Sequence, residues 1–298
     1  MTFFVYLPLL FSLVVAVVAT RMARWLPPDL AARTATAGAA VSALTLTASL
    51  TMLSLTLFDD LPPLSAFDHR PELGLPKPVP GWLAAIAALV LLVGVGRVVL
   101  DLVRRTRLRR DLKAMGTSRA GIAVADVAEP FAVAVPGRPG HVLVTSGMLR
   151  LLDDRERRVL LAHERSHLIR HHHRLVAIAG CATAINPLLY PMPTLVAYLV
   201  ERWADEDAAA RTGDRELVAK TVAKASLATR GQRLVPAMGL HSSSAVDRVA
   251  AMAEPARQRR WGGIAGVAAL TVAQVLATGL AVVEFVSDAG AWLGMVLG

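Results

Sequence analysis

The 298-residue sequence has a single cysteine, Cys181, and few aromatic residues, which make up 5% of the chain. One cysteine excludes an intrachain disulfide framework and fits a reducing compartment or a plain buried thiol. Hydrophobic residues nevertheless reach 54% and the mean hydropathy is +0.49, so the apolar mass consists of alanine, valine and leucine. This composition predicts a membrane protein.

Acidic residues are in the minority, because 32 lysines and arginines outnumber 23 aspartates and glutamates and give a net charge of +9. Such a surplus can indicate a nucleic-acid partner. Here the basic residues cluster beside apolar runs, which is typical of the cytoplasmic flanks of membrane spans. We therefore expect the lipid bilayer, and no nucleic acid, as a partner.

No basic residue precedes the first apolar run, residues 3–20, so this run lacks the positively charged start of a secretory signal peptide. Further apolar runs cover residues 34–58, 82–100 and 262–286, each long enough to cross a bilayer. A dense basic cluster begins at Arg104 and places the following segment in the cytoplasm. The sequence predicts a multi-pass plasma-membrane protein with its N-terminus outside.

These runs divide the chain into three regions. Residues 1–103 are expected to hold three transmembrane helices, with an external proline-rich loop at 59–80. Residues 104–260 would form a cytoplasmic domain, and residues 261–298 the last transmembrane helix with a short tail. Apolar residues 175–200 are interrupted by prolines 187, 191 and 193, which favour a membrane-associated helical hairpin over a single crossing.

Short β-prone runs lie at residues 121–127, 131–135 and 141–145. The turn-forming segment 136–140 separates the last two runs and predicts a β-hairpin. The edge strand of such a sheet can hold an extended peptide by strand addition. The alternative is a hairpin that only packs against the following helix.

The central stretch of the chain, residues 153–174, is predicted to be helical. Asp153 can cap its N-terminus with Glu156 as capping-box partner, and neither proline nor glycine follows before Gly180. We expect an uninterrupted helix here, with His171 and His172 at a solvated end.

Within this helix His163, Glu164 and His167 spell H-E-x-x-H. The spacing puts two imidazoles one turn apart on one face, with a carboxylate beside them. This pattern predicts one Zn²⁺ per chain, with Glu164 as general base of a metalloprotease. A basic amphipathic helix with two chance histidines is the alternative.

Catalytic zinc requires three protein ligands and an open position for water. His173 lies ten positions after His163, the spacing of the metzincins, but Arg170 stands where that motif has a glycine. Glu201 is the other candidate for the third ligand. Asp205, one helical turn further on, could orient a ligand imidazole.

Four segments together resemble the BlaR/MecR-type membrane zinc metallopeptidases and, more distantly, the HtpX and CAAX prenyl protease group: residues 131–151, 161–167, 186–188 and 201–208. The resemblance extends over residues 80–285. It implies a multi-span α-helical membrane protein with a cytoplasmic zincin-like α+β domain. It also implies a gluzincin site with the zinc ligands His163, His167 and Glu201, the base Glu164 and the supporting carboxylate Asp205.

A donor to the developing oxyanion is also expected in such a site. His241 is a candidate, because it precedes residues 246–248 roughly as a functional histidine does in the related proteases. The spacing matches poorly, and a surface histidine is the alternative.

The predicted function is hydrolysis of a cytoplasmic or membrane-proximal protein, such as a transcriptional repressor in a signalling pathway. The β-lactam sensors of the resembling family carry a penicillin-binding domain after the last span, whereas this sequence ends at Gly298, so direct antibiotic sensing is not expected. The alternatives are a quality-control protease for membrane proteins and a non-catalytic metal-binding scaffold. The sequence leaves the oligomeric state open.

Overall fold

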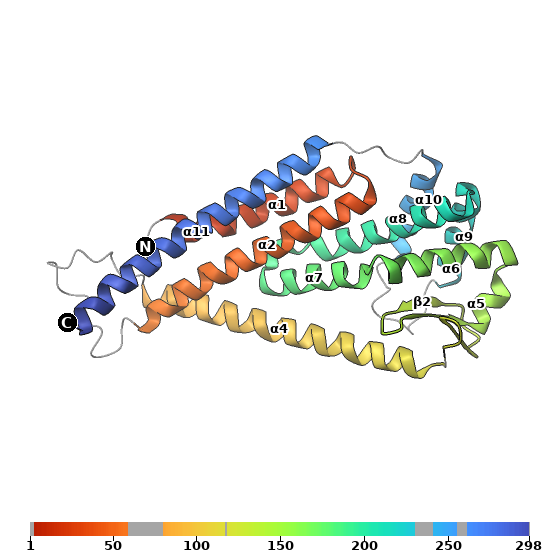
Figure 1. The fold of residues 1–298 in the computed structure, drawn as a ribbon, viewed down its shortest axis with the longest axis horizontal. Coiled ribbons are helices and arrows are strands. Elements are labelled where there is room, and N and C mark those ends of the chain that lie inside the picture. The colour runs from red at the N-terminus through yellow and green to blue at the C-terminus, as the bar shows by residue number, and fades with distance from the viewer. Residues whose placement is uncertain (1–2, 59–79, 117, 230–240, 255–260, 298) are drawn as a thin grey trace.

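The computed structural model describes residues 3–58, 80–116, 118–229, 241–254 and 261–297. The molecule is elongated, with long helices at one end and a small sheet with shorter helices at the other (Figure 1). Both termini lie at the end remote from the sheet. Nearly all of the expected external loop at 59–80 falls outside the described residues.

The long helices are mostly apolar. They are α1 (Leu7–Met22), α2 (Pro28–Leu55), α4 (Gly81–Ala114) and α11 (Trp261–Leu297). The 3-10 helix η1 (Phe3–Tyr6) precedes α1, and the 3-10 helix η2 (Thr56–Phe58) follows α2. Three described helices are long and apolar enough to cross a membrane: Pro28–Leu55, Gly81–Ala114 and Ala265–Ser287. With 16 residues, α1 rises only about 24 Å, less than a hydrocarbon core of about 30 Å. The run at 3–20, expected to be a span, is therefore a shorter helix than the other three.

Small residues and polar contacts join these helices. A Cβ on Gly38 would lie 3.2 Å from a methyl of Val15, so this glycine lets α1 approach α2 closely. Buried Gln274 of α11 accepts a hydrogen bond from the Ser42 hydroxyl (3.1 Å) and donates one to Thr45 (2.8 Å). These bonds fasten the last helix to α2.

The sheet has three strands in the order β1-β3-β2: β1 (Ile122–Ala125), β2 (Ala132–Val135) and β3 (His141–Thr145). β2 pairs with β3 antiparallel, which confirms the predicted hairpin, and β1 pairs with β3 parallel. β2 is thus an edge strand. The short helix α5 (Ser146–Leu151) follows, with the Thr145 hydroxyl accepting the Met148 N–H at its start.

The next helix, α6 (Asp154–Ile169), begins with the predicted capping box. The Asp153 carboxylate accepts the Glu156 N–H (2.9 Å) and the Glu156 carboxylate accepts the Asp153 N–H (3.0 Å). The expectation of one uninterrupted helix over residues 153–174 is wrong. The helix ends at Ile169, His171 adopts a left-handed backbone with φ 55°, and α7 (His172–Ile185) starts afresh.

The apolar run 175–200 is divided, as its prolines predict. After α7 the turn η4 (Pro187–Leu189) leads into α8 (Met192–Thr212), which packs alongside α7 and α6. The second helix of the predicted hairpin and the segment that carries Glu201 form one continuous helix, α8. Then follow α9 (Arg215–Ala228) and α10 (His241–Ala253).

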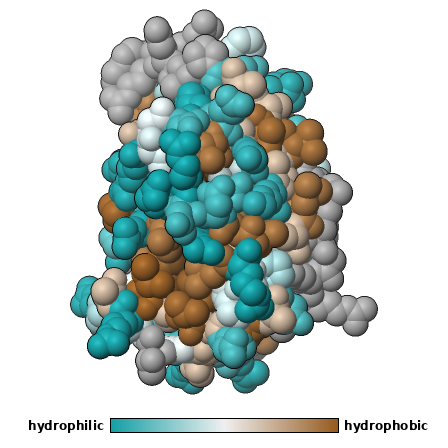
Figure 2. All heavy atoms as spheres, turned by 90° about the vertical axis from the view of Figure 1, so that its right-hand side faces the viewer, coloured by the Kyte–Doolittle hydropathy of each residue, from teal (hydrophilic) through white to brown (hydrophobic). Residues whose placement is uncertain are grey.

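The end of the molecule that carries the sheet is largely hydrophilic, with a hydrophobic patch between the polar side chains (Figure 2). The long helices instead expose many apolar side chains, such as Leu92 of α4 (70%) and Val283 of α11 (69%). Exposed apolar area of this extent is typical of surfaces that face lipid.

Candidate metal centre and active site

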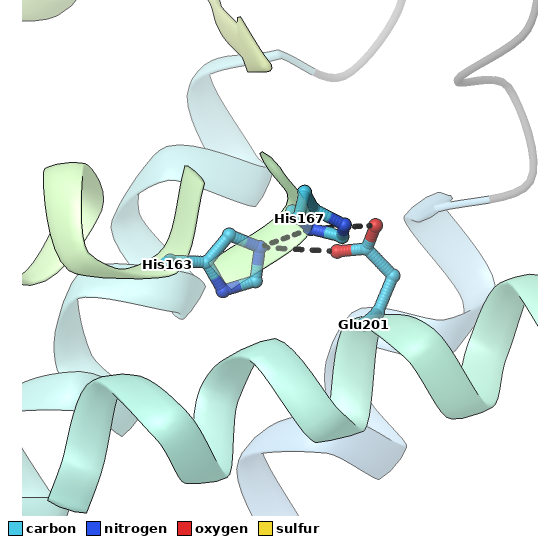
Figure 3. A group of neighbouring side chains, drawn as sticks. All are labelled: His163, His167 and Glu201. Atoms are coloured by element: carbon cyan, nitrogen blue, oxygen red, sulfur yellow. Dashed lines mark hydrogen bonds and ion pairs between the residues drawn. The ribbon is translucent and has the colours of Figure 1, made fainter. Parts of the chain in front are cut away.

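Three side chains of the predicted zinc site converge between α6 and α8 (Figure 3). The Nε2 atoms of His163 and His167 lie 3.2 Å apart. A carboxylate oxygen of Glu201 lies 3.3 Å from Nε2 of His163, and its other oxygen lies 3.5 Å from Nε2 of His167. The long helix α8 brings Glu201 to this place because it returns alongside α6.

These separations fit a metal ion. Zn–N and Zn–O bonds of about 2.0–2.1 Å at tetrahedral angles put ligand atoms about 3.3 Å apart. The donor set of two imidazoles and one carboxylate is the one that catalytic zinc takes in several peptidases. His173, the rival third ligand, lies outside this cluster, with its ring 5.9 Å from that of His171.

Behind the cluster lies a buried ion-pair network. An Asp205 oxygen is 3.0 Å from Nδ1 of His163, a position compatible with the predicted role of this carboxylate in orienting the imidazole. Arg248 of α10 donates two hydrogen bonds to Asp205, of 2.8 and 2.7 Å, and lies 3.1 Å from Glu201. Its guanidinium therefore neutralises part of the negative charge of two carboxylates.

His172 supports the other imidazole. Its Nδ1 lies 3.0 Å from Nδ1 of His167, and its ring lies 4.6 Å from the ring of Trp203. The expectation of a solvated His172 is wrong, because the residue is 1% exposed. The helix break at Ile169 turns His172 inward, whereas His171 is exposed.

Glu164 lies beside the cluster and faces the sheet. It is buried, and the backbone of Ala134 in β2 lies close enough to its carboxyl group to act against the rise in its pKa. Burial raises the pKa of Glu164 to about 7, although the charge of His163 acts in the opposite direction. A carboxylate with a pKa near neutrality can both accept and return a proton.

The cluster favours a cation. Burial alone would lower the pKa of His163, but the carboxylates of Asp205 and Glu201 raise it to about 10. Burial lowers the pKa of His167 to about 4. Despite its burial, Glu201 keeps a pKa well below its ordinary value because of His167 and Arg248. A metal ion bound here would replace the proton that these carboxylates hold on His163.

Comparison with known families agrees with this geometry. Residues 97–197 match the model of peptidase family M48. The match supports a relationship of this segment to the M48 metallopeptidase family. It covers the end of α4, the sheet, α6 and α7, and it stops shortly before Glu201. No curated protein and no solved structure matches the chain.

An M48 peptidase is a metal-dependent protease, and the His163, His167 and Glu201 cluster is compatible with that dependence. No sequence pattern pointed to the role of Arg248 or to the buried position of His172. Both act through contacts between elements that are distant along the chain. The side chain of His241, the expected oxyanion donor, lies outside the described residues, and its backbone starts α10.

Proposed function

We propose that the chain is a membrane zinc endopeptidase of the BlaR/MecR type, with one zinc ion held by His163, His167 and Glu201. The observation that carries this proposal is the set of ligand distances between 3.2 and 3.5 Å, formed by residues of two different helices. Asp205 and His172 contact the far nitrogens of the two imidazoles. Both rings are thereby oriented with Nε2 toward the metal.

Zinc at this place supplies a Lewis acid for the peptide carbonyl and lowers the pKa of the attacking water. Glu164 accepts the proton of that water and passes it to the leaving amine nitrogen. Its raised pKa suits both steps. The burial of His163 and Glu164 keeps bulk water away from the reacting groups.

The edge strand β2 supports an extended peptide as substrate. It lies next to α6, and Ala134 in its middle contacts Glu164. A peptide that pairs with this edge would run past the general base. The substrate is then a flexible segment of a cytoplasmic or membrane-proximal protein, such as the transcriptional repressor that the resemblance implies.

Charge supports a cytoplasmic site. Arginines and a lysine crowd the last part of α4 from Arg104 to Lys113, and this end of α4 reaches the sheet (Figure 1). Positive flanks favour the cytoplasmic side. If the sheet lies on the cytoplasmic side, both termini lie on the outer side of the membrane.

The test measures zinc content and proteolysis of the purified full chain in detergent, with a peptide library as substrate. Glu164→Gln should keep zinc and lose cleavage by at least about 10³-fold, because it removes the proton acceptor. Glu201→Ala should lose zinc as well. His173→Ala is the matched control and should keep both.

Cleavage that persists in Glu164→Gln would contradict the proposal, as would zinc loss in His173→Ala. Zinc binding without any cleavage would favour the non-catalytic scaffold. Degradation of many misfolded membrane proteins would favour quality control over one regulatory cut.

A further inference from the structure

A cavity lies away from the metal ligands. It has a volume of about 550 Å³ and is bordered by the junction of α1 and α2, by α8 and by α10. Leu26, Leu195 and Leu199 form apolar walls, and Arg202 and Asp247 belong to its polar lining. The cavity is thus amphipathic.

Arg202 is the unusual member of this lining. The residue is 7% exposed, and its buried Nε has no hydrogen-bond partner among the described residues. Its ion pair with Glu206 is long, at 3.8 Å, and Arg215 already holds Glu206 with hydrogen bonds of 2.6 and 3.1 Å. An arginine stays charged in proteins, and a buried charge is costly unless an anion pairs with it.

The unpartnered Nε of Arg202 can therefore donate to an anionic group of a ligand in the cavity. A phosphate group fits best, since a guanidinium can donate two parallel hydrogen bonds to its oxygens. Arg24 lines the same cavity and adds a second positive charge.

The apolar surface of α1 leads to this cavity. Leu10, Leu13 and Val17 are 58%, 51% and 40% exposed and lie on one face of the helix. Thr20 continues the same face three residues after Val17, and Arg24 follows in the turn after α1; both line the cavity. An acyl chain along this stripe would bring its phosphate to the cavity.

Acidic residues on the α10 side complete the charge pattern. Asp247 and Glu254 line the cavity together with Arg24 and Arg202, so its lining carries both carboxylates and guanidinium groups. We propose that the cavity binds the headgroup of phosphatidylethanolamine, with the phosphate on Arg202 and the ammonium group on Asp247. The lipid would contact α10 one residue from Arg248, which pairs with the carboxylates of the metal site.

Native mass spectrometry of the full chain in detergent tests this proposal. Dioleoyl phosphatidylethanolamine, phosphatidylglycerol and phosphatidylcholine are titrated separately, and inorganic phosphate is added as a competitor. We expect one phosphatidylethanolamine per chain, bound at least about tenfold more tightly than either other lipid, because the amine pairs with a carboxylate.

Four variants locate the binding. Arg202→Gln should weaken phosphatidylethanolamine binding at least about tenfold. Ala250→Trp fills the cavity from an exposed position and should act similarly without the risk to folding that attends a buried arginine. Asp247→Asn should remove the preference over phosphatidylglycerol. The control is Arg211→Gln. Arg211 is exposed, lies on α8 as Arg202 does and is outside the cavity, so this variant should bind the lipid as the unchanged chain does.

Unchanged lipid binding in Ala250→Trp would overturn the assignment of the cavity. Equal affinity for the three lipids would overturn the role of the amine. Inorganic phosphate that displaces the lipid at millimolar concentration would assign the site to free phosphate instead.

Discussion

The Nδ1 atoms of His167 and His172 lie 3.0 Å apart, so one of them must carry the shared proton. His167 directs its other nitrogen at Glu201 and His163, which leaves Nδ1 as the protonated atom when Nε2 binds a metal. His172 must then accept with a neutral ring. Burial lowers the pKa of His172 to about 3, which keeps the ring neutral.

His172→Phe should therefore weaken zinc binding by about 10–100-fold, the usual cost of losing a partner behind a ligand imidazole. Phenylalanine keeps a ring against Trp203 and removes both ring nitrogens, including the Nδ1 that accepts the proton. The zinc dissociation constant is measured by chelator competition. His173→Phe makes the same chemical change outside the cluster and should leave that constant unchanged, and an equal effect of both variants would argue against the pairing.

Arg248→Met leaves the fully buried Asp205 and the neighbouring Glu201 without their guanidinium. Breaking a buried ion pair on one side costs about 3–5 kcal/mol of unfolding free energy. We expect a loss of this size in the metal-free protein, measured by denaturant unfolding in detergent. Zinc should restore part of it, because the metal neutralises Glu201.

The matched control for this loss is Arg211→Met on the exposed side of α8, which should change stability by less than about 0.5 kcal/mol. If Arg248→Met lost no more stability than this control, the network would contribute nothing to the fold. If zinc restored nothing, Glu201 would not be a metal ligand.

Local rules were enough for the start of α6 and for the β2–β3 hairpin. The capping box of Asp153 and Glu156 and this hairpin both depend on residues close together along the chain. Each was predictable because a few neighbouring residues satisfy the backbone groups involved.

The helix break near His171 was not predictable in this way, since no glycine or proline marks it. A non-glycine residue with φ 55° is uncommon and persists only where tertiary contacts compensate for it. Those contacts are the packing of His172 on His167 and Trp203. Arg248 was missed for a similar reason, because it lies 43 residues beyond Asp205 and no local pattern connects the two.

Gln274→Leu tests the polar contact in the helical bundle. It removes both hydrogen bonds to α2. The hydroxyls left behind can instead donate to backbone carbonyls of their own helix, as the Thr45 hydroxyl already does to Val41 and Ser42. Hydrogen bonds between membrane helices contribute about 0.6 kcal/mol on average and at most about 1.7 kcal/mol. We expect a loss in this range by unfolding in detergent, and a larger loss would show that the hydroxyls are left unpaired.

Glu156 ties the start of α6 to α9 and makes stability depend on pH. Its side chain is 1% exposed and accepts a 2.6 Å hydrogen bond from Lys224. Burial alone would raise the pKa of Glu156, but Lys224 and the Asp153 N–H lower it below 4.5. The ionised carboxylate therefore stabilises the fold above pH 4.5, and this contribution is lost as the pH falls through the lowered pKa.

Lys224→Met should lower the unfolding free energy at pH 7 by about 1 kcal/mol, because Lys224 is partly exposed and water can replace some of its bond. The difference from the unchanged chain should shrink as the pH falls and vanish below the lowered pKa of Glu156, where the carboxyl is protonated in both proteins. Denaturant unfolding over a series of pH values from 7 down to about 2 measures it. Lys220→Met, exposed on the same helix, should show little loss at any of these pH values, and a Lys224→Met deficit that stays constant down to the lowest pH would mean that Lys224 acts through packing rather than charge.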